Sequence, residues 1–253
     1  REVVEKVKIL YFDCYSGISG DMTIGALIDI GVDEAELMQE LNKLGIEGYK
    51  LHIKKGIKSG ITGTDFIVEL EDHHDHDHDS HNHHNSFKEI IELILNSDIS
   101  ENAKEMSVAI FEKLAKAEGK VHDVDYEDVH FHEVGAIDSI IDIVGTAICI
   151  DILKPDMMIS SPVNVGSGLI KCQHGVFPVP APATLELLKG IPIYSKGVGE
   201  LTTPTGAAIL STLCNEFGTM PQMVIDKIGY GLGTNDYEIA NCLRVCTGKL
   251  KKK

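Results

Sequence analysis

The clearest indication of the fold class comes from residues 7–30, VKILYFDCYSGISGDMTIGALIDI. The run 7–12 is short and mostly apolar, which is typical of a buried strand. It stops at Asp13, and the Gly- and Ser-rich segment 16–20 then turns the chain into a helix predicted over 22–30. Because a helix that directly follows a buried strand buries its apolar stripe against a sheet, this stretch predicts helices packed on a β-sheet.

Helical and strand-like segments are mixed along the rest of the chain, which predicts an α/β fold with a mixed β-sheet and flanking helices; an α+β fold is the alternative. We expect residues 1–253 to form a single region. Ser86, Ser100 and Thr203 are predicted N-caps, and Pro204 occupies the favoured first helical position. Further helices are predicted over 33–44, 86–96, 100–118, 136–153, 183–189 and 204–217, and strands over 49–54, 64–70, 157–165, 191–195, 223–228 and 242–247, with a turn-rich segment at 166–182.

The composition excludes several classes of function. The 253 residues carry 23 Lys and Arg against 39 Asp and Glu, a formal net charge of −16, and this charge argues against binding to nucleic acid. No run of 18 apolar residues occurs, so no membrane span is expected. The six cysteines are scattered without a CxxC motif, and no signal peptide is recognised, so we expect a cytoplasmic protein with reduced thiols.

The most conspicuous segment is the tract 72–85, which we expect to form a mobile loop because it has no apolar anchor. It holds seven of the twelve histidines, interleaved with aspartates. Imidazole is a common ligand of nickel, zinc and copper, so the tract predicts metal loading or storage. A purification tag, an inert solvated loop and an unspecific zinc buffer are the alternatives. The candidate metal ligands are His73, His74, His76, His78, His81, His83 and His84.

A second constellation covers residues 129–142. His130 and His132 point to the same side of an extended segment and form a candidate chelating pair, with Glu133 next to them. Asp138 and Asp142 are four residues apart and share one face of the predicted helix. Two carboxylates on a mostly apolar helix are costly unless a cation compensates them, which favours a metal or acid–base site. Caps or pairing with lysine are the alternative.

Two turns could each hold an anion at a helix N-terminus. The first contains Ser16, Gly17, Ser19, Gly20 and Asp21. Asp13 and Asp21 are candidates for holding a cation or a ribose beside it, and helix-dipole pairing is the alternative for Asp21. The second turn contains Thr203, Thr205 and Gly206, with simple N-capping as the alternative.

A separate candidate base or metal ligand is His174. It is followed by Gly175 and then by a segment that three prolines stiffen. A structural hydrogen bond is the alternative for this histidine.

Four stretches resemble, in this order, the LarC family of nickel insertion proteins, and the histidine tract fits the same family. Family members insert nickel into pyridinium-3,5-bisthiocarboxylic acid mononucleotide in a CTP-dependent reaction with Mg²⁺ or Mn²⁺. The product that the resemblance implies is the nickel-pincer nucleotide, the cofactor of lactate racemase, whose apoenzyme receives it. The stretches are DCYSGISGDM at 13–22, VHFHEVGAIDSIIDIVG at 129–145, GLIKCQHGVFPVPAPAT at 168–184 and ELTTPTGAAIL at 200–210.

The resemblance implies roles for these residues. His130, His132 and Glu133 become candidates for nickel transfer, and Asp138 and Asp142 would assist them or bind the divalent ion that accompanies CTP. His174 becomes the candidate base for the ring proton, or a ligand, and the two turns become candidates for the nucleotide phosphates. The resemblance is to the N-terminal part of the family, and it assigns CTP binding chiefly to a C-terminal part, which is therefore an implied partner.

Three other functions stay open on the sequence alone. A nickel storage or chaperone module would work through the tract 72–85. A metal-dependent nucleotidyltransferase or phosphohydrolase would use Asp13, Asp21 and the three histidines at 130, 132 and 174. A soluble domain with an incidental histidine loop is the third. The oligomeric state is also open, a homo-oligomer included.

Overall fold

Strand β1 (Lys6–Asp13) lies inside a seven-stranded sheet. The computed structural model describes residues 6–71, 86–131, 137–172 and 175–251. Strand β1 runs parallel to one neighbour and antiparallel to the other, so the sheet is mixed, and the predicted α/β class is confirmed. The strand order is β11 (Glu216–Phe217), β4 (Met157–Ser160), β1, β13 (Cys242–Lys251), β12 (Met223–Leu232), β3 (Ile61–Leu70) and β2 (Tyr49–Lys58).

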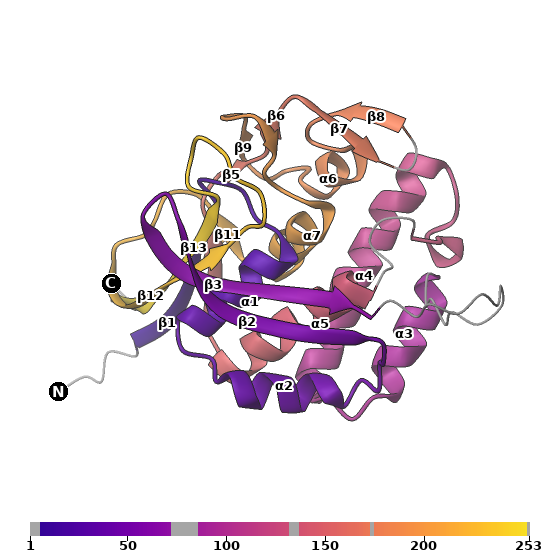
Figure 1. Ribbon diagram of the computed structural model, residues 1–253, viewed down its shortest axis with the longest axis horizontal. Coiled ribbons are helices and arrows are strands. Elements are labelled where there is room, and N and C mark those ends of the chain that lie inside the picture. The colour runs from indigo at the N-terminus through magenta and orange to yellow at the C-terminus, as the bar shows by residue number, and fades with distance from the viewer. Residues whose placement is uncertain (1–5, 72–85, 132–136, 173–174, 252–253) are drawn as a thin grey trace.

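Alternate residues of β1 point to opposite faces of the sheet. Leu10 and Phe12 enter the main core, whereas Ile9 and Tyr11 join a small apolar cluster on the other face. The main core is formed with the helices, which lie mostly to one side of the sheet in Figure 1. The helices are α1 (Gly20–Asp29), α2 (Glu34–Asn42), α3 (Phe87–Asn96), α4 (Glu101–His122), α5 (Ile137–Leu153), α6 (Pro182–Leu187) and α7 (Pro204–Leu213), with a 3₁₀ turn at Tyr126–Asp128.

Helix α1 is the link between the sheet and the helical layer. It packs against β12 and β3 on one side and against α5 on the other. Helix α5 is apolar on nearly all sides and is largely buried, because α1, α2, α4 and α7 all contact it. Among the described residues, no helix combines the length and the apolar character that crossing a membrane requires.

The predicted N-caps are confirmed. The hydroxyl of Ser86 accepts a hydrogen bond from the backbone N–H of Glu89, and that of Ser100 accepts one from Ala103. Thr203 caps α7 in the same way, with Pro204 at the first helical position. These bonds satisfy backbone donors that the first helical turn leaves without an intrahelical partner.

The predicted helix over 204–217 is wrong at its end. Helix α7 stops at Leu213, and the chain then forms the edge strand β11. Asn215 is the physical reason, since its backbone N–H donates to the Met158 carbonyl and its side-chain oxygen accepts from the Met158 N–H at 2.9 Å. Pairing with β4 replaces the last turn of the predicted helix.

The segment predicted as turn-rich, 166–182, also contains short strands. They belong to two of the three two-stranded sheets that the described residues form beside the main one, and the strand predicted over 157–165 is interrupted at Pro162, as a proline at an edge or bulge should cause. The pairs are β5 (Val163–Asn164) with β9 (Ile193–Tyr194), β6 (Gly166–Ser167) with β10 (Gly199–Glu200), and β7 (Leu169–Cys172) with β8 (Gly175–Pro178).

The capping box of α3 provides a first test of this local structure. Replacing Ser86 with alanine is expected to lower the free energy of unfolding by about 1 kcal/mol, because the Glu89 N–H loses its acceptor. Urea denaturation would measure the change. Ser86→Thr keeps the hydroxyl and should retain most of the stability, so an equal loss in both variants would contradict the capping argument.

Candidate active site

The two turns singled out in the sequence lie against each other. The backbone N–H of Ile18 donates to the Leu201 carbonyl at 2.9 Å, and the N–H of Thr203 donates to the Ile18 carbonyl at 3.1 Å. Ile18 and Thr202 thereby form a parallel bridge between segments that are far apart in the sequence. The N-termini of α1 and α7, which follow these turns, are consequently held side by side.

Two glycines make this close approach feasible. A Cβ atom on Gly17 would lie 1.8 Å from the Leu201 carbonyl oxygen, and one on Gly206 would lie 2.2 Å from the Ile18 carbonyl oxygen. Gly17 also has a φ of +77°, in the region that favours glycine. As placed, both glycines serve backbone packing. Neither they nor the buried Ser16 line the pocket described next, so their predicted contact with a phosphate stays a prediction.

A third helix N-terminus, that of α5, completes a pocket of about 390 Å³. Asp142 of α5 lies against the first turn of α1, where a Cβ on Gly20 would come within 2.5 Å of the Asp142 side chain. The pocket brings together seven of the residues singled out in the sequence, from three separate segments. They are Ser19, Gly20, Asp21, Asp138, Asp142, Thr203 and Thr205.

The electrostatics of the pocket centre on Asp142. Its Oδ1 atom is enclosed and has no hydrogen-bond partner in the described structure. Burial raises the pKa of Asp142 well above its usual value, the negative charges of Asp21 and Asp138 raise it further, and a hydrogen bond from the backbone N–H of Asp21 offsets part of the effect. Burial likewise raises the pKa of Asp21, although the Ser19 hydroxyl donates to its carboxylate.

The lining of the pocket is acidic. Glu200 lines it together with the three aspartates, and none of the described lining residues is Lys, Arg or His. Such a pocket attracts cations. In the part of the chain that the structure describes, however, no three His, Cys, Asp or Glu side chains are arranged to share one metal ion. The described carboxylates therefore supply negative potential and do not form a ready-made metal cage.

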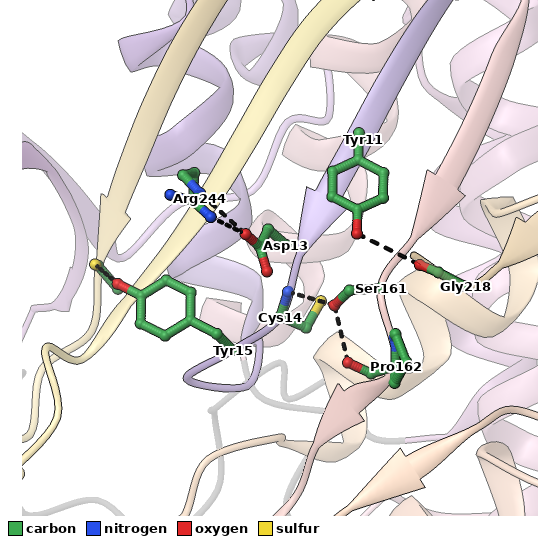
Figure 2. Close-up of polar contacts among 9 residues, drawn as sticks. Tyr11, Asp13, Cys14, Tyr15, Ser161, Pro162, Gly218 and Arg244 are labelled. Atoms are coloured by element: carbon green, nitrogen blue, oxygen red, sulfur yellow. Dashed lines mark hydrogen bonds and ion pairs between the residues drawn. The ribbon is translucent and has the colours of Figure 1, made fainter. Parts of the chain in front are cut away.

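Asp13, a candidate metal ligand, lies outside this pocket. Its carboxylate accepts hydrogen bonds from Nε of Arg244 at 3.0 Å and from Nη2 (Figure 2). The guanidinium also lies over the Tyr15 ring, 5.9 Å from the ring centroid. Figure 2 shows this cluster at the end of β1, with Arg244 contributed by β13. The ion pair with Arg244 therefore engages one carboxylate oxygen of Asp13, Oδ2, away from the acidic pocket.

The candidate histidine that the structure describes, His130, also lies apart from the pocket. Its side chain is exposed, and its backbone forms an antiparallel bridge with Ser86. This bridge places His130 beside the residue that directly follows the tract 72–85. Outside the described residues lie His132, Glu133, His174, His73, His74, His76, His78, His81, His83 and His84.

Several residues of the site were not predicted from the sequence. Glu200 stands three residues before the N-cap Thr203, and its acidic side chain so close to a helix start was the available signal. Phe66 and Val68 on β3 form an apolar wall of the pocket, and Thr234 completes its rim; no local motif marks them. Arg244, the partner of Asp13, was missed because 231 residues separate the two.

Cys14, which stands in the first turn motif, is a structural residue. Its side chain is fully buried, its backbone N–H donates to the Ser161 hydroxyl at 2.9 Å, and burial raises the pKa of its thiol to about 12. We expect Cys14 to resist iodoacetamide at neutral pH in the native protein, because alkylation needs an accessible thiolate. The partly exposed Cys172 should react, and mass spectrometry of the digested protein would compare the two. Native-state alkylation of Cys14 at the rate of Cys172 would contradict this placement.

Comparison with known proteins agrees with the resemblance described above. The model of the family described as "Nickel insertion protein" matches residues 10–253. A putative nickel insertion protein of Dictyoglomus thermophilum is 48% identical over 245 residues, which are 96% of this chain and 61% of that protein. The pyridinium-3,5-bisthiocarboxylic acid mononucleotide nickel insertion protein of Clostridium kluyveri is 50% identical over 252 residues, 97% of this chain and 63% of that protein.

A protein with the same name from Geobacillus kaustophilus is 49% identical over 250 residues, 96% of this chain and 60% of that protein. The chain thus spans about three fifths of the length of these relatives. No solved structure matches it. The family model covers nearly every residue, including all three segments that meet at the pocket, and the chain therefore belongs to the nickel insertion protein family.

Proposed function

We propose that this chain takes part in inserting nickel into pyridinium-3,5-bisthiocarboxylic acid mononucleotide, and that the pocket between α1, α5 and α7 is where the ion and the mononucleotide meet. The observation that supports this most strongly is the convergence of Asp21, Asp138, Asp142 and Glu200 on one pocket without a basic residue among its described lining. The names of the relatives supply the substrate and the ion.

The donor atoms suit a transfer of nickel. The mononucleotide offers two thiocarboxylates, whose soft sulfur atoms are good ligands for a late first-row metal. The described side chains that line the pocket offer carboxylate and hydroxyl oxygens, which are harder ligands, and they hold no preformed three-ligand site. Because the ion is held loosely by the protein and firmly by sulfur, its movement to the substrate is favourable.

The finer parts of the function belong to the same proposal. CTP with Mg²⁺ or Mn²⁺ would act through the remaining part of the longer relatives, and the product would be the nickel-pincer nucleotide used by lactate racemase-type enzymes. The tract 72–85 with His130, His132 and Glu133 would collect nickel and pass it on. The bridge between His130 and Ser86 supports this, since it holds one of these histidines beside the residue that follows the tract in the sequence.

The test is an insertion assay with the mononucleotide, Ni²⁺, CTP and Mg²⁺, in which the remaining part of the Clostridium kluyveri relative is supplied as a separate polypeptide. Mass spectrometry would detect the nickel-containing product. We expect Asp142→Asn to lower the rate about 10- to 100-fold, the range found when groups that support a metal site are removed. Asp226→Asn is the matched control, because it removes the same charge from an exposed position paired with Lys249.

Two results would count against the proposal. If Asp142→Asn inserted nickel at the wild-type rate, the pocket would not be the place where nickel and the mononucleotide meet. If no combination of the wild-type chain and the added polypeptide formed product, the chain would not take part in nickel insertion.

A further inference from the structure

The described lining of the pocket is acidic without a basic residue, and this negative charge affects how the substrate can enter. Three aspartates and Glu200 line it, and no Lys, Arg or His is among its described lining residues. Within this cluster, the enclosed Oδ1 of Asp142 has no hydrogen-bond partner among the described residues, and the side chain lies against the first turn of α1. A buried acceptor without a partner is costly, and a bound ligand that carries positive charge or a donor would relieve that cost.

The reacting end of the mononucleotide does not fit this pocket by itself. Its pyridinium ring carries one positive charge and its two thiocarboxylates carry two negative charges, so that end is a net anion. Entry would bring both thiocarboxylates next to like charges in a partly desolvated site, where such repulsion is strong. One Ni²⁺ ion bound between the sulfur atoms reverses the sign and makes the same end a net cation.

We propose, on the basis of the proposed function, that nickel enters the pocket first and that the thiocarboxylate end of the mononucleotide enters only when the ion is already there. The carboxylates raise the local concentration of Ni²⁺. The ion then bridges two sets of negative groups that otherwise repel each other. The partly exposed side chain of Val68, backed by the buried Phe66, accepts the face of the ring, and the phosphate stays outside the acidic pocket.

Binding of nickel before the mononucleotide prevents the formation of an unproductive, metal-free complex. A substrate that binds without metal would block the pocket, and the charge of Asp21, Asp138 and Asp142 disfavours that complex. The same charge has no such effect on the metal-loaded ring. The pocket therefore selects the pair of substrates over either the organic substrate alone or an inorganic anion.

The binding experiment uses the 253-residue chain, the mononucleotide and calorimetry, without CTP and without the remaining part of the relatives. We expect Ni²⁺ to tighten binding of the mononucleotide at least tenfold. Mg²⁺ is the control ion, because it screens the carboxylates equally but is a hard ion that does not favour sulfur ligands. Equal affinity with and without nickel, or an equal gain from magnesium, would overturn the proposal.

A variant ties the effect to the pocket. Asp142→Asn should bind the nickel-free mononucleotide several-fold more tightly than the wild type and should show a smaller gain from nickel. A variant that is merely damaged would weaken both affinities. Asp226→Asn should keep the wild-type nickel dependence. An unchanged nickel dependence in Asp142→Asn would overturn the proposal, because a nickel–substrate complex would then bind elsewhere.

Failure of the proposed binding order can be distinguished from failure of the proposed function. If the insertion assay yields product while binding of the mononucleotide is independent of nickel, only the order of binding is wrong. If the mononucleotide fails to bind under any condition and no product forms, the proposed function fails together with the order. Nickel-dependent binding without product would leave the order standing and place the chemistry in another part of the longer proteins.

Discussion

Replacing Gly231 with alanine is expected to destabilise the protein by about 3 kcal/mol, the upper part of the usual range for overpacking. Gly231 is on β12 and faces α1. A Cβ atom there would lie 1.8 Å from the Met22 carbonyl oxygen and 2.6 Å from the Ala26 backbone nitrogen. Both contacts are with backbone atoms of a helix, so no side-chain rotation can relieve them. The helix would have to move away from the sheet.

Urea denaturation would measure this loss, with Gly218→Ala as the matched control. Gly218 is also outside the helices, but no heavy atom lies within 4 Å of the position that a Cβ would take there. Its substitution should therefore change stability by less than about 0.5 kcal/mol. Similar stability of the two variants would contradict the packing argument. Since α1 carries Asp21 at its first turn, Gly231→Ala should also disturb the pocket.

Replacing Asp142 with asparagine is expected to have the opposite effect and to raise the free energy of unfolding at neutral pH by about 1 kcal/mol, as is common when a strained functional group is removed. Burial and the charges of Asp21 and Asp138 raise the pKa of Asp142 in the folded protein. The folded state therefore binds the proton more tightly than the unfolded state does. The stability that this carboxyl contributes is present below about pH 4, its unfolded pKa, and is lost as pH rises through the folded value.

The difference between Asp142→Asn and the wild type should accordingly grow as pH increases from about 4. Denaturation of the metal-free protein at a series of pH values would measure it. Asp226→Asn, whose parent carboxylate is exposed and pairs with Lys249 at 3.6 Å, should show little change at any pH. A wild type that is more stable than Asp142→Asn at neutral pH would show that the buried carboxylate is compensated in the folded state.

Together with a loss of insertion activity, a gain in stability would identify Asp142 as a residue retained for function. A residue that only supports the fold would lose both when replaced. The two readouts are independent, because one measures the metal-free folded state and the other measures the reaction with its substrates.

Much of the fold was accessible from local patterns. The apolar run of β1, the caps Ser86, Ser100 and Thr203, and the mixture of helices and strands predict the elements correctly, because each depends on neighbours within a few residues. The end of α7 was predicted wrongly, since pairing of Asn215 with Met158 is a contact between segments 57 residues apart. Local propensity contains no term for such pairing.

The sequence singled out seven of the residues that line the pocket, among them Asp138 and Asp142, and its resemblance to the nickel insertion proteins indicated the family to which the chain belongs. The tertiary structure decides which of these residues lie close to one another. The hydrogen bonds between Ile18 and Leu201 bring two helix N-termini together, and the absence of a side chain on Gly20 lets Asp142 approach them. Spacing along the chain determines which residues share one face of a helix. The distance between helices is determined by how they pack against each other. This packing brings three separate segments together at one acidic pocket.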